Sequence, residues 1–270
     1  GRLPETHAEQ VGVILRLPLV EDPGTALLVW TAQPWSLPAN VAVAAHPEHE
    51  YVIVEHDLPE YSGGGTEKLI LARKQAAAIL GQAPVRIFES FRGSRLKGLR
   101  YQPLFTYLLP DKPAYQVVLA ESVAGDTGTG LVPLAPPFSE QACQAAQAHN
   151  LPVLHTMTRE GTFINEIRPW RGLSLHQAAP LIVQDLQQRG LVFQSQTENV
   201  TIPACPACGS PLIDYTQRSW SVRTLAARHR LASLARQVEW HPASLPADPG
   251  KAGLVPAADW LVGRAGSWGA

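Results

Sequence analysis

The sequence predicts a mixed α/β fold built around a β-barrel or a β-sandwich, and two patterns support this prediction. Many short runs are rich in apolar and β-branched residues and are separated by turn residues, as strands are. A few longer segments instead have helical spacing; most of them begin at or after a serine or threonine, and two end at a glycine. With 270 residues, of which 45% are hydrophobic and 17% charged, the chain is long enough to bury a sizeable core.

Six strands are predicted, and the first two are expected to pair. Segments 11–20 and 26–32 are apolar, and the turn residues Pro23 and Gly24 predict that they form a hairpin. Further strands are predicted at 41–46, 51–56, 114–123 and 191–200. The balance of parallel and antiparallel pairing does not follow from the sequence.

Four helices are predicted, over residues 66–80, 139–149, 174–189 and 224–240. Thr66, Ser139 and Ser174 are suitable N-caps for the first three. Pro180 lies inside the third and requires a kink or a later start, because proline cannot donate the backbone hydrogen bond.

Charge and cysteine content limit the function classes. The net charge is −1, so any contact with RNA must come from a local patch, such as the basic loop 92–100 or the basic helix 224–240. For the helix, the favoured interpretation is a solvated surface whose other face is packed by Leu225, Leu231 and Leu234. Three cysteines do not make a disulfide framework, and no run of about 18 apolar residues occurs, so we expect a soluble, cytoplasmic protein without membrane contact.

Cys205 and Cys208 have the two-residue gap of a zinc knuckle, but four ligands are needed to close such a site. They are either half of a structural zinc site whose second cysteine pair lies outside this chain, or a turn with two free thiols. The histidines at 46, 49 and 56 lack metal-ligand spacing and are interpreted as strand-end surface.

The sequence disfavours two other kinds of site. Residues 126–130 read DTGTG, without the spacing or the lysine of a phosphate-binding loop, although such a glycine loop lets a ligand approach the backbone closely. A serine hydrolase is disfavoured because no Gly-x-Ser-x-Gly elbow occurs.

Taken in order, three segments resemble the isoleucine–tRNA ligase family. They are WTAQPWSLPANVAVAAHPEHEYV from Trp30, DTGTGLVPLAPPFSEQA from Asp126, and PACPACGSPLIDYTQRSWSVRT from Pro203. The resemblance extends from about residue 11 to the end. It implies a β-barrel editing domain, of the type found in valine, isoleucine and leucine ligases, over residues 1–200. Residues 201–270 would form a cysteine knuckle, a helix and a junction toward a class I catalytic domain outside this chain.

In that family the domain hydrolyses valine wrongly esterified to isoleucine tRNA, because one methylene gives the synthetic site only about 1–3 kcal/mol of discrimination. The resemblance therefore implies an aminoacyl-tRNA ester hydrolase whose partners are the acceptor end of isoleucine tRNA and the rest of a ligase. It implies no cofactor for editing. Aminoacylation by this chain is excluded, since the His-x-Gly-His and Lys-Met-Ser-Lys-Ser motifs are absent.

Carried over residue by residue, the resemblance places Thr31 and Asn40 as positioning residues of catalysis. Substrate-binding positions are Trp30, Ala32, Gln33, Gly128, Thr129, Gly130, Pro133 and Ala142. Ala32 and Gln33 stand where the family has threonines, Pro133 where it has a histidine, and Ala142 where an aspartate holds the substrate ammonium. A buried ammonium without a carboxylate lacks a compensating charge.

These substitutions leave two hypotheses open. In the first, the chain is an editing domain that hydrolyses the ester through a positioned water, with no protein nucleophile. In the second, it is a non-catalytic tRNA-binding or scaffolding relative of the ligase, in which the fold survives and the pocket has lost its activity.

Overall fold

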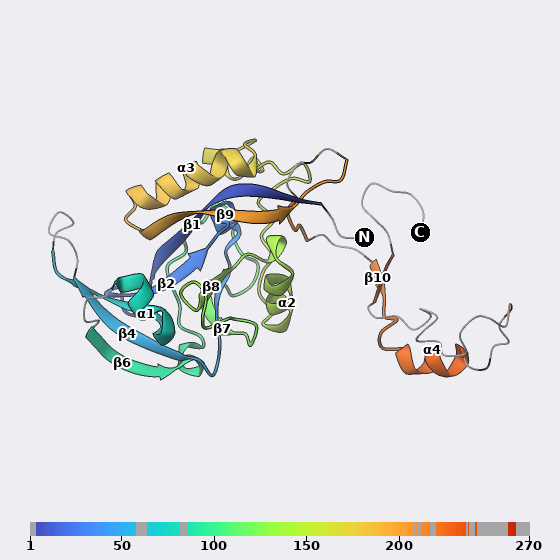
Figure 1. Cartoon of the computed structure of the whole chain (residues 1–270), viewed down its shortest axis with the longest axis horizontal. Coiled ribbons are helices and arrows are strands. Elements are labelled where there is room, and N and C mark those ends of the chain that lie inside the picture. The colour runs from blue at the N-terminus through green and yellow to red at the C-terminus, as the bar shows by residue number, and fades with distance from the viewer. Residues whose placement is uncertain are drawn as a thin grey trace. The chain divides into compact units, whose positions relative to one another are not determined.

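The computed structural model describes residues 4–57, 64–81, 86–207, 209, 212–216, 220–235, 237, 241 and 259–262. The chain divides into two compact units, Gly1–Thr216 and Gln217–Ala270. The larger unit contains two β-sheets and three α-helices within its described residues (Figure 1).

The larger sheet has six strands in the order β6-β4-β5-β2-β1-β9. Their bounds are β1 Glu5–Pro18, β2 Thr25–Thr31, β4 Glu50–Asp57, β5 Thr66–Ala72, β6 Arg86–Arg92 and β9 Val192–Pro203. The predicted hairpin is confirmed, because β1 and β2 pair antiparallel with Val13 opposite Thr31. The β2–β5 pair is parallel, whereas the other four pairs are antiparallel.

The smaller sheet has three strands in the order β7-β3-β8, namely β3 Ala42–Ala45, β7 Gln116–Leu119 and β8 Leu131–Leu134. β3 is parallel to β7 and antiparallel to β8. Pro133 lies opposite Val43 on β8, at the edge of this sheet, where a residue without a backbone N–H is tolerated.

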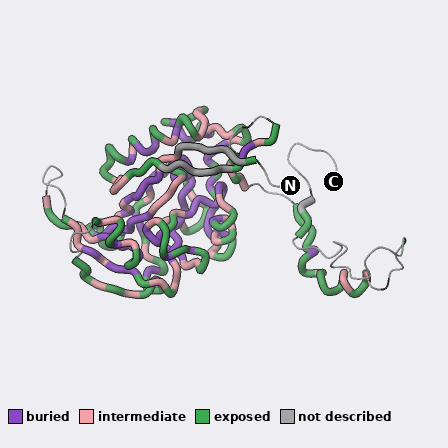
Figure 2. The backbone as a smooth tube through the Cα atoms, viewed as in Figure 1, coloured by how far each residue is buried: buried purple, intermediate pink, exposed green. Residues whose placement is uncertain are grey.

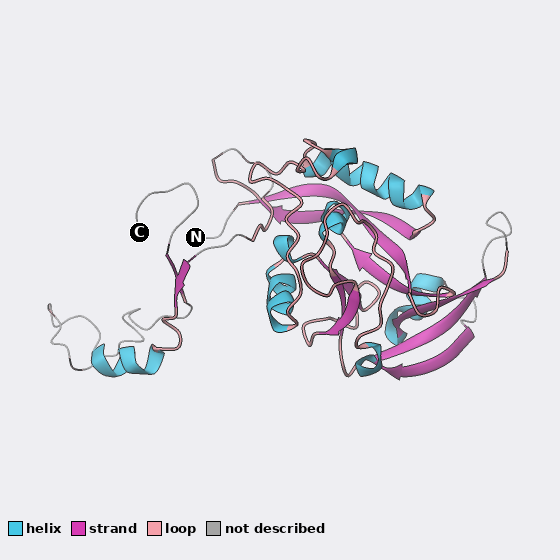
Figure 3. Ribbon diagram, turned by 180° about the vertical axis from the view of Figure 1, so that it is seen from behind, coloured by secondary structure: helices cyan, strands magenta, loops and turns pink. Residues whose placement is uncertain are grey.

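The helices of the larger unit are α1 Arg73–Leu80, α2 Glu140–Ala148 and α3 Leu175–Gln188. Short 3₁₀ helices are η1 Pro34–Ala39, η3 Gly93–Leu96, η4 Pro136–Phe138 and η5 Arg168–Trp170. Ser174 caps α3 in a capping box with Gln177, and the helix continues through Pro180. Figures 1 and 3 both show α3 lying along β1 and β9.

Buried residues lie mainly in the middle of the larger unit (Figure 2). The main core cluster joins residues of both sheets to Trp35 and Leu37 of η1 and to Ile182 and Leu186 of α3. A second cluster packs Ala142 and Ala146 of α2 beneath the three-stranded sheet. The elements that carry the first two resemblance segments, from Trp30 and from Asp126, are therefore held by the core.

Two sequence-based predictions need correction. The barrel is not confirmed, because β6 and β9 end the six-stranded sheet and the described strands do not close on themselves. The predicted helix 66–80 is wrong in its first half, since β5 occupies Thr66–Ala72 and Ala72, not Thr66, is the N-cap of α1. β5 is central and its last four residues are buried, so its continuous apolar run has no period that separates strand from helix.

The smaller unit is described in part. β10 Trp220–Val222 and β11 Trp260–Val262 pair antiparallel, and α4 Arg228–Ala235 lies within the predicted basic helix. No buried side chain occurs on α4. Over the described residues of the whole chain, no helix is long and apolar enough to span a membrane.

Candidate functional site: a pocket between the proline turn and the glycine loop

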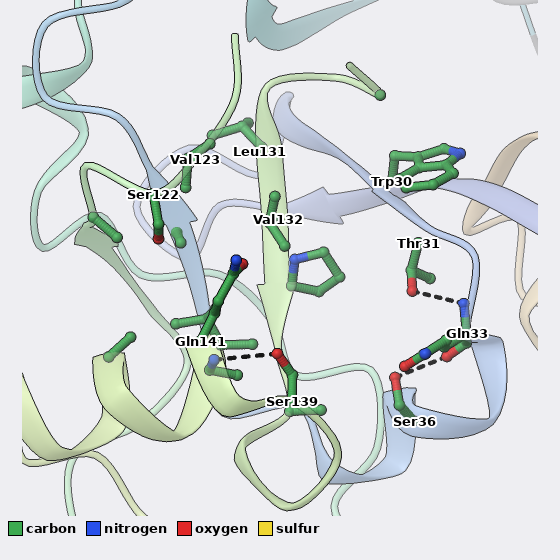
Figure 4. Close-up of a pocket in the computed structure, with 18 of the residues that line it drawn as sticks. Trp30, Thr31, Gln33, Ser36, Ser122, Val123, Leu131, Val132, Ser139 and Gln141 are labelled. Carbon is green, nitrogen blue, oxygen red and sulfur yellow. Dashed lines mark hydrogen bonds between the residues drawn. The ribbon is translucent and has the colours of Figure 1, made fainter. Parts of the chain in front are cut away.

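A pocket of about 370 Å³ lies where β2, η1, β8, α2 and the loop after β7 meet (Figure 4). It brings together eight of the ten residues that the sequence assigned to catalysis or substrate binding. These are Trp30, Thr31, Ala32, Gln33, Gly128, Thr129, Pro133 and Ala142. Segments about 100 residues apart in the sequence thus form opposite walls of one cavity.

One wall is the turn that follows β2. The backbone N–H of Gln33 donates to Thr31 Oγ1 at 3.0 Å, and Ser36 Oγ donates to the Gln33 carbonyl at 2.8 Å. Pro34 opens η1, where its missing N–H costs nothing, and every residue of η1 is buried. Because Thr31 accepts this bond, its hydroxyl proton remains available to donate into the pocket.

The opposite wall is the glycine loop. Gly128 has φ +56°, and a Cβ there would lie 3.1 Å from Cβ of Trp30, so the loop backbone packs directly on this tryptophan. Gly130 has φ +72°, and a Cβ there would lie 2.4 Å from Cβ of Ala72. Tyr51 Oη also donates to the Gly130 carbonyl at 2.8 Å. Glycine at these two positions is therefore required by the packing of the pocket wall.

Thr129 lines the pocket, but its hydroxyl is already engaged. The side chain is fully buried, donates to the Leu131 carbonyl at 3.1 Å and accepts from the Leu131 N–H at 3.3 Å. Its contribution to the site is to fix the loop that carries Gly128.

Asn40 and Gly130 are not among the residues that line the pocket. Asn40 is buried, and its amide donates to the carbonyls of Ala42 at 2.9 Å and Leu134 at 3.3 Å. Tyr101 Oη donates to Asn40 Oδ1 at 2.6 Å. Asn40 therefore ties the end of η1 to β3 and β8, and it acts on the pocket through these elements.

The structure adds polar lining residues that the sequence did not indicate. Ser36, Ser122, Thr127, Ser139 and Gln141 also line the pocket. Ser139 was expected only as an N-cap, a function it performs by accepting from the Ala142 N–H at 3.3 Å. Figure 4 shows Gln141 extending from α2 into the pocket toward Ser122. The sequence placed Ser122 inside a predicted strand, 114–123, but β7 ends at Leu119 and Ser122 lies in the loop that follows.

A second cavity of about 400 Å³ adjoins the first through shared residues. Trp30, Thr127 and Gly128 line both, and Gln75, Gln194 and Gln196 contribute amides to the second. The indole of Trp30 is held between two glycines, since a Cβ on Gly12 would lie 3.3 Å from its Nε1. A ligand with two parts could therefore extend across Trp30.

A histidine pair lies behind the glycine loop. The rings of His46 and His49 stack with centroids 3.7 Å apart, and a Cβ on Gly125 would lie 2.6 Å from His49 Nδ1. Burial, followed by His46 and Lys74, lowers the pKa of His49 below its ordinary value, while Asp126 acts in the opposite direction. Among the described residues, no group of three or more His, Cys, Asp or Glu side chains could hold a metal.

The cysteine half-site is only partly visible. Cys205 is a half-buried free thiol, and Cys208 lies outside the described residues. The zinc knuckle therefore stays a prediction.

The chain is similar over nearly its whole length to one part of a larger enzyme. It is 32% identical over 243 residues to an isoleucine–tRNA ligase of Clostridium novyi, covering 90% of this chain and 22% of that protein. It is also 32% identical over 262 residues to the Thermus thermophilus ligase, covering 95% of this chain and 24% of that protein. The chain is homologous to a segment of the isoleucine–tRNA ligases. It spans less than a quarter of their length.

Solved structures identify the fold of the chain. The cytosolic leucyl-tRNA synthetase editing domain of P. knowlesi matches with a TM-score of 0.51 at 12% identity, over 72% of this chain and 96% of that one. The corresponding P. falciparum domain matches with a TM-score of 0.52 at 10% identity, over 70% of this chain and 100% of that one. No protein-family model matches the chain. The chain thus has the mixed α/β fold of these editing domains.

Proposed function

We propose that this ligase segment is an editing domain whose pocket binds the aminoacyl end of a charged tRNA and hydrolyses the ester. One observation carries the proposal: the proline turn and the glycine loop, which hold the resemblance to the isoleucine ligases, line a single pocket. The adjoining cavity across Trp30 gives room for the terminal nucleotide beside the acyl group. By the same resemblance, the partners are the acceptor end of isoleucine tRNA and the rest of a class I ligase.

In this mechanism a water oxygen attacks the ester carbonyl carbon, and the bond to the ribose oxygen breaks. The products are the free acid and a tRNA whose ribose hydroxyl has taken up the proton. Thr31 donates a hydrogen bond from its hydroxyl to the ester carbonyl oxygen, and Gly128 lets the ester approach the loop backbone. No cofactor takes part in this step. A closed barrel of the editing-domain type would require additional pairing between the edge strands β6 and β9, which the described residues do not make.

The experiment measures deacylation of tRNA charged with valine, threonine, isoleucine or N-acetylvaline, together with binding of each. The N-acetyl substrate makes the result independent of the charge on the α-nitrogen. Thr31→Val keeps the shape and removes the donor, so we expect hydrolysis to fall by roughly tenfold or more. The control is Thr66→Val, an exposed threonine on β5 that should leave the rate unchanged. Equal rates in both variants would reject the proposed function of Thr31.

The second candidate is a non-catalytic tRNA-binding relative, and the assay separates the two. Retained binding with hydrolysis at the background rate would establish the second candidate and reject the first. The structure favours the pocket over the basic loop as the site of recognition. Arg92, Arg95 and Arg100 pair with Glu48, Glu89 and Glu21 respectively, so carboxylates offset the positive charge of this loop.

A further inference from the structure

The side chains around the pocket share one chemical property: they are uncharged. Among the described residues, the lining consists of aliphatic and aromatic groups, the hydroxyls of serine and threonine, and the amides of Gln33 and Gln141. No aspartate, glutamate, lysine, arginine or histidine is among these lining residues. A ligand in this pocket therefore meets hydrogen-bonding dipoles but no counter-ion.

The carboxylates that are closest in the sequence to the pocket-lining residues do not line the pocket themselves. Glu121 and Asp126 are exposed and line a hollow with His46, His49 and Lys74. This hollow adjoins the pocket through Ser122, Val123 and Ala124. Glu140, in the first turn of α2, is exposed and accepts from Gln144 Nε2 at 3.1 Å. Lys74 lines the same hollow as Glu121 and Asp126, and neither of these carboxylates is among the residues that line the pocket.

The wall formed by α2 also disfavours a cation. Ser139, Gln141 and Ala142 at the N-terminal end of this nine-residue helix line the pocket. A helix carries partial positive charge at its N-terminus, because the first N–H groups have no partner in the helix. An ammonium group on this side of the pocket would meet like charge, whereas a carbonyl oxygen would be stabilised.

We infer that the pocket selects acyl groups whose α-nitrogen is uncharged, such as an N-acylated aminoacyl ester, and disfavours a free α-ammonium. This inference rests on the proposed function, since it names the class of acyl group that the same pocket accepts. The physical reason is desolvation: a buried charge without a partner is costly, whereas an amide N–H can bond to Gln141 or Thr31. A free amine enters only after it loses its proton.

The test uses two ligands that cannot be hydrolysed as esters: the valyl amide of 3′-amino-3′-deoxyadenosine and its N-acetyl derivative. Dissociation constants are measured by calorimetry between pH 6 and 9. An α-amine has a pKa of about 8, so below it the affinity for the free-amine ligand should fall about tenfold per pH unit. The N-acetyl ligand has no such proton, and its affinity should not change.

A carboxylate introduced on the pocket wall should reverse this preference. Gln141→Glu is nearly isosteric and exposed, so the fold should tolerate it, and it should tighten binding of the free-amine ligand at pH 7 by at least tenfold. The matched control is Gln147→Glu, an exposed position on the same helix that does not line the pocket and should change neither affinity.

Each outcome has a distinct meaning. Tighter binding of the N-acetyl ligand at pH 7, with the reversal in Gln141→Glu, supports the inference. If the free-amine ligand binds at pH 6.5 as tightly as the N-acetyl ligand or more tightly, the inferred selectivity is wrong while the proposed function stands. If neither ligand binds at any pH, the pocket is not an acyl site, and both the inference and the proposed function are overturned.

Discussion

The hydrogen bond between Tyr101 and Asn40 shows how one buried residue supports the pocket without lining it. Both side chains are buried, and burial raises the pKa of Tyr101 well above its ordinary value, so its hydroxyl stays protonated and donates. Tyr101→Phe would leave Asn40 Oδ1 without this donor. We expect the free energy of unfolding to fall by about 1–3 kcal/mol in urea titrations.

The control for this prediction is Tyr107→Phe, because Tyr107 is only half buried. In this variant the free energy of unfolding should fall by no more than about 0.5 kcal/mol, as for most changes near the surface. Equal losses in the two variants would mean that the bond to Asn40 does not stabilise the fold.

Gly130 is the loop residue at which an added methyl group should cost most. Its φ of +72° already disfavours any other residue, and the added Cβ would lie 2.4 Å from that of Ala72. Gly98 has φ +83° with open space around it, so Gly98→Ala should show the conformational cost alone, about 1–2 kcal/mol. Gly130→Ala should lose about 1–3 kcal/mol more in the same unfolding assay. Similar losses would show that Ala72 does not restrain the loop.

At this scale the sequence could predict the residues that carry distinctive motifs but not their partners. Trp30, Thr31 and Gly128 were found because they lie in short, recognisable segments. Ser122 and Gln141 were missed, since nothing local distinguishes a pocket-lining serine or glutamine from a surface one. Asn40 was assigned a positioning function from its motif. Only the three-dimensional contacts reveal that its amide donates to the backbone of β3 and β8 instead of facing the pocket.

At the scale of elements, the segments with clear end signals were predicted and the buried strand was not. Ser139 and Ser174 marked the starts of α2 and α3, and both cap their helices in the structure. β5 was missed because Thr66, its first residue, resembles an N-cap, and the buried apolar run that follows has no periodicity that separates strand from helix. Pairing beyond the β1–β2 hairpin also escaped prediction, since the parallel β2–β5 contact depends on the path of the chain between these strands, which local sequence does not encode.

The loop that joins β3 to β4 should make stability depend on pH. The folded state lowers the pKa of His49, so below its ordinary pKa the unfolded chain binds the proton more readily. Stability is then present above pH of about 6.5 and is lost as the pH falls toward the lowered pKa. His49→Gln should reduce the decrease in Tm between pH 7 and pH 5.

The charged and titratable groups around His49 are His46 and Lys74, which oppose its protonation, and Asp126, which favours it. Glu48, Glu50, Glu121 and Arg73 line the hollows next to the ring. The control is His176→Gln, an exposed histidine on α3 that should keep the full pH dependence. A Tm that decreases equally in both variants would assign the acid sensitivity to other groups.

At the scale of the molecule, the core and the pocket belong to the unit Gly1–Thr216. The buried hydrophobic clusters use residues between Val13 and Leu186, with Ile213 and Tyr215 packed against them. Tyr215 Oη donates to the Met157 carbonyl at 3.0 Å, and the Thr216 N–H donates to the Pro137 carbonyl at 2.7 Å. Thr216 is therefore the last residue that the structure ties to this unit by a described hydrogen bond.

A chain truncated after residue 216 should therefore fold and keep the pocket. We expect the same Tm as the full chain in calorimetry, and unchanged affinity for the N-acetylvalyl amide ligand. A control truncated after residue 202 removes Tyr215 and Thr216 and should lose stability, because the carbonyls of Met157 and Pro137 lose these donors. If truncation after residue 216 lowers Tm or affinity as much as the control does, residues 217–270 are needed for folding, and the pocket depends on the whole chain.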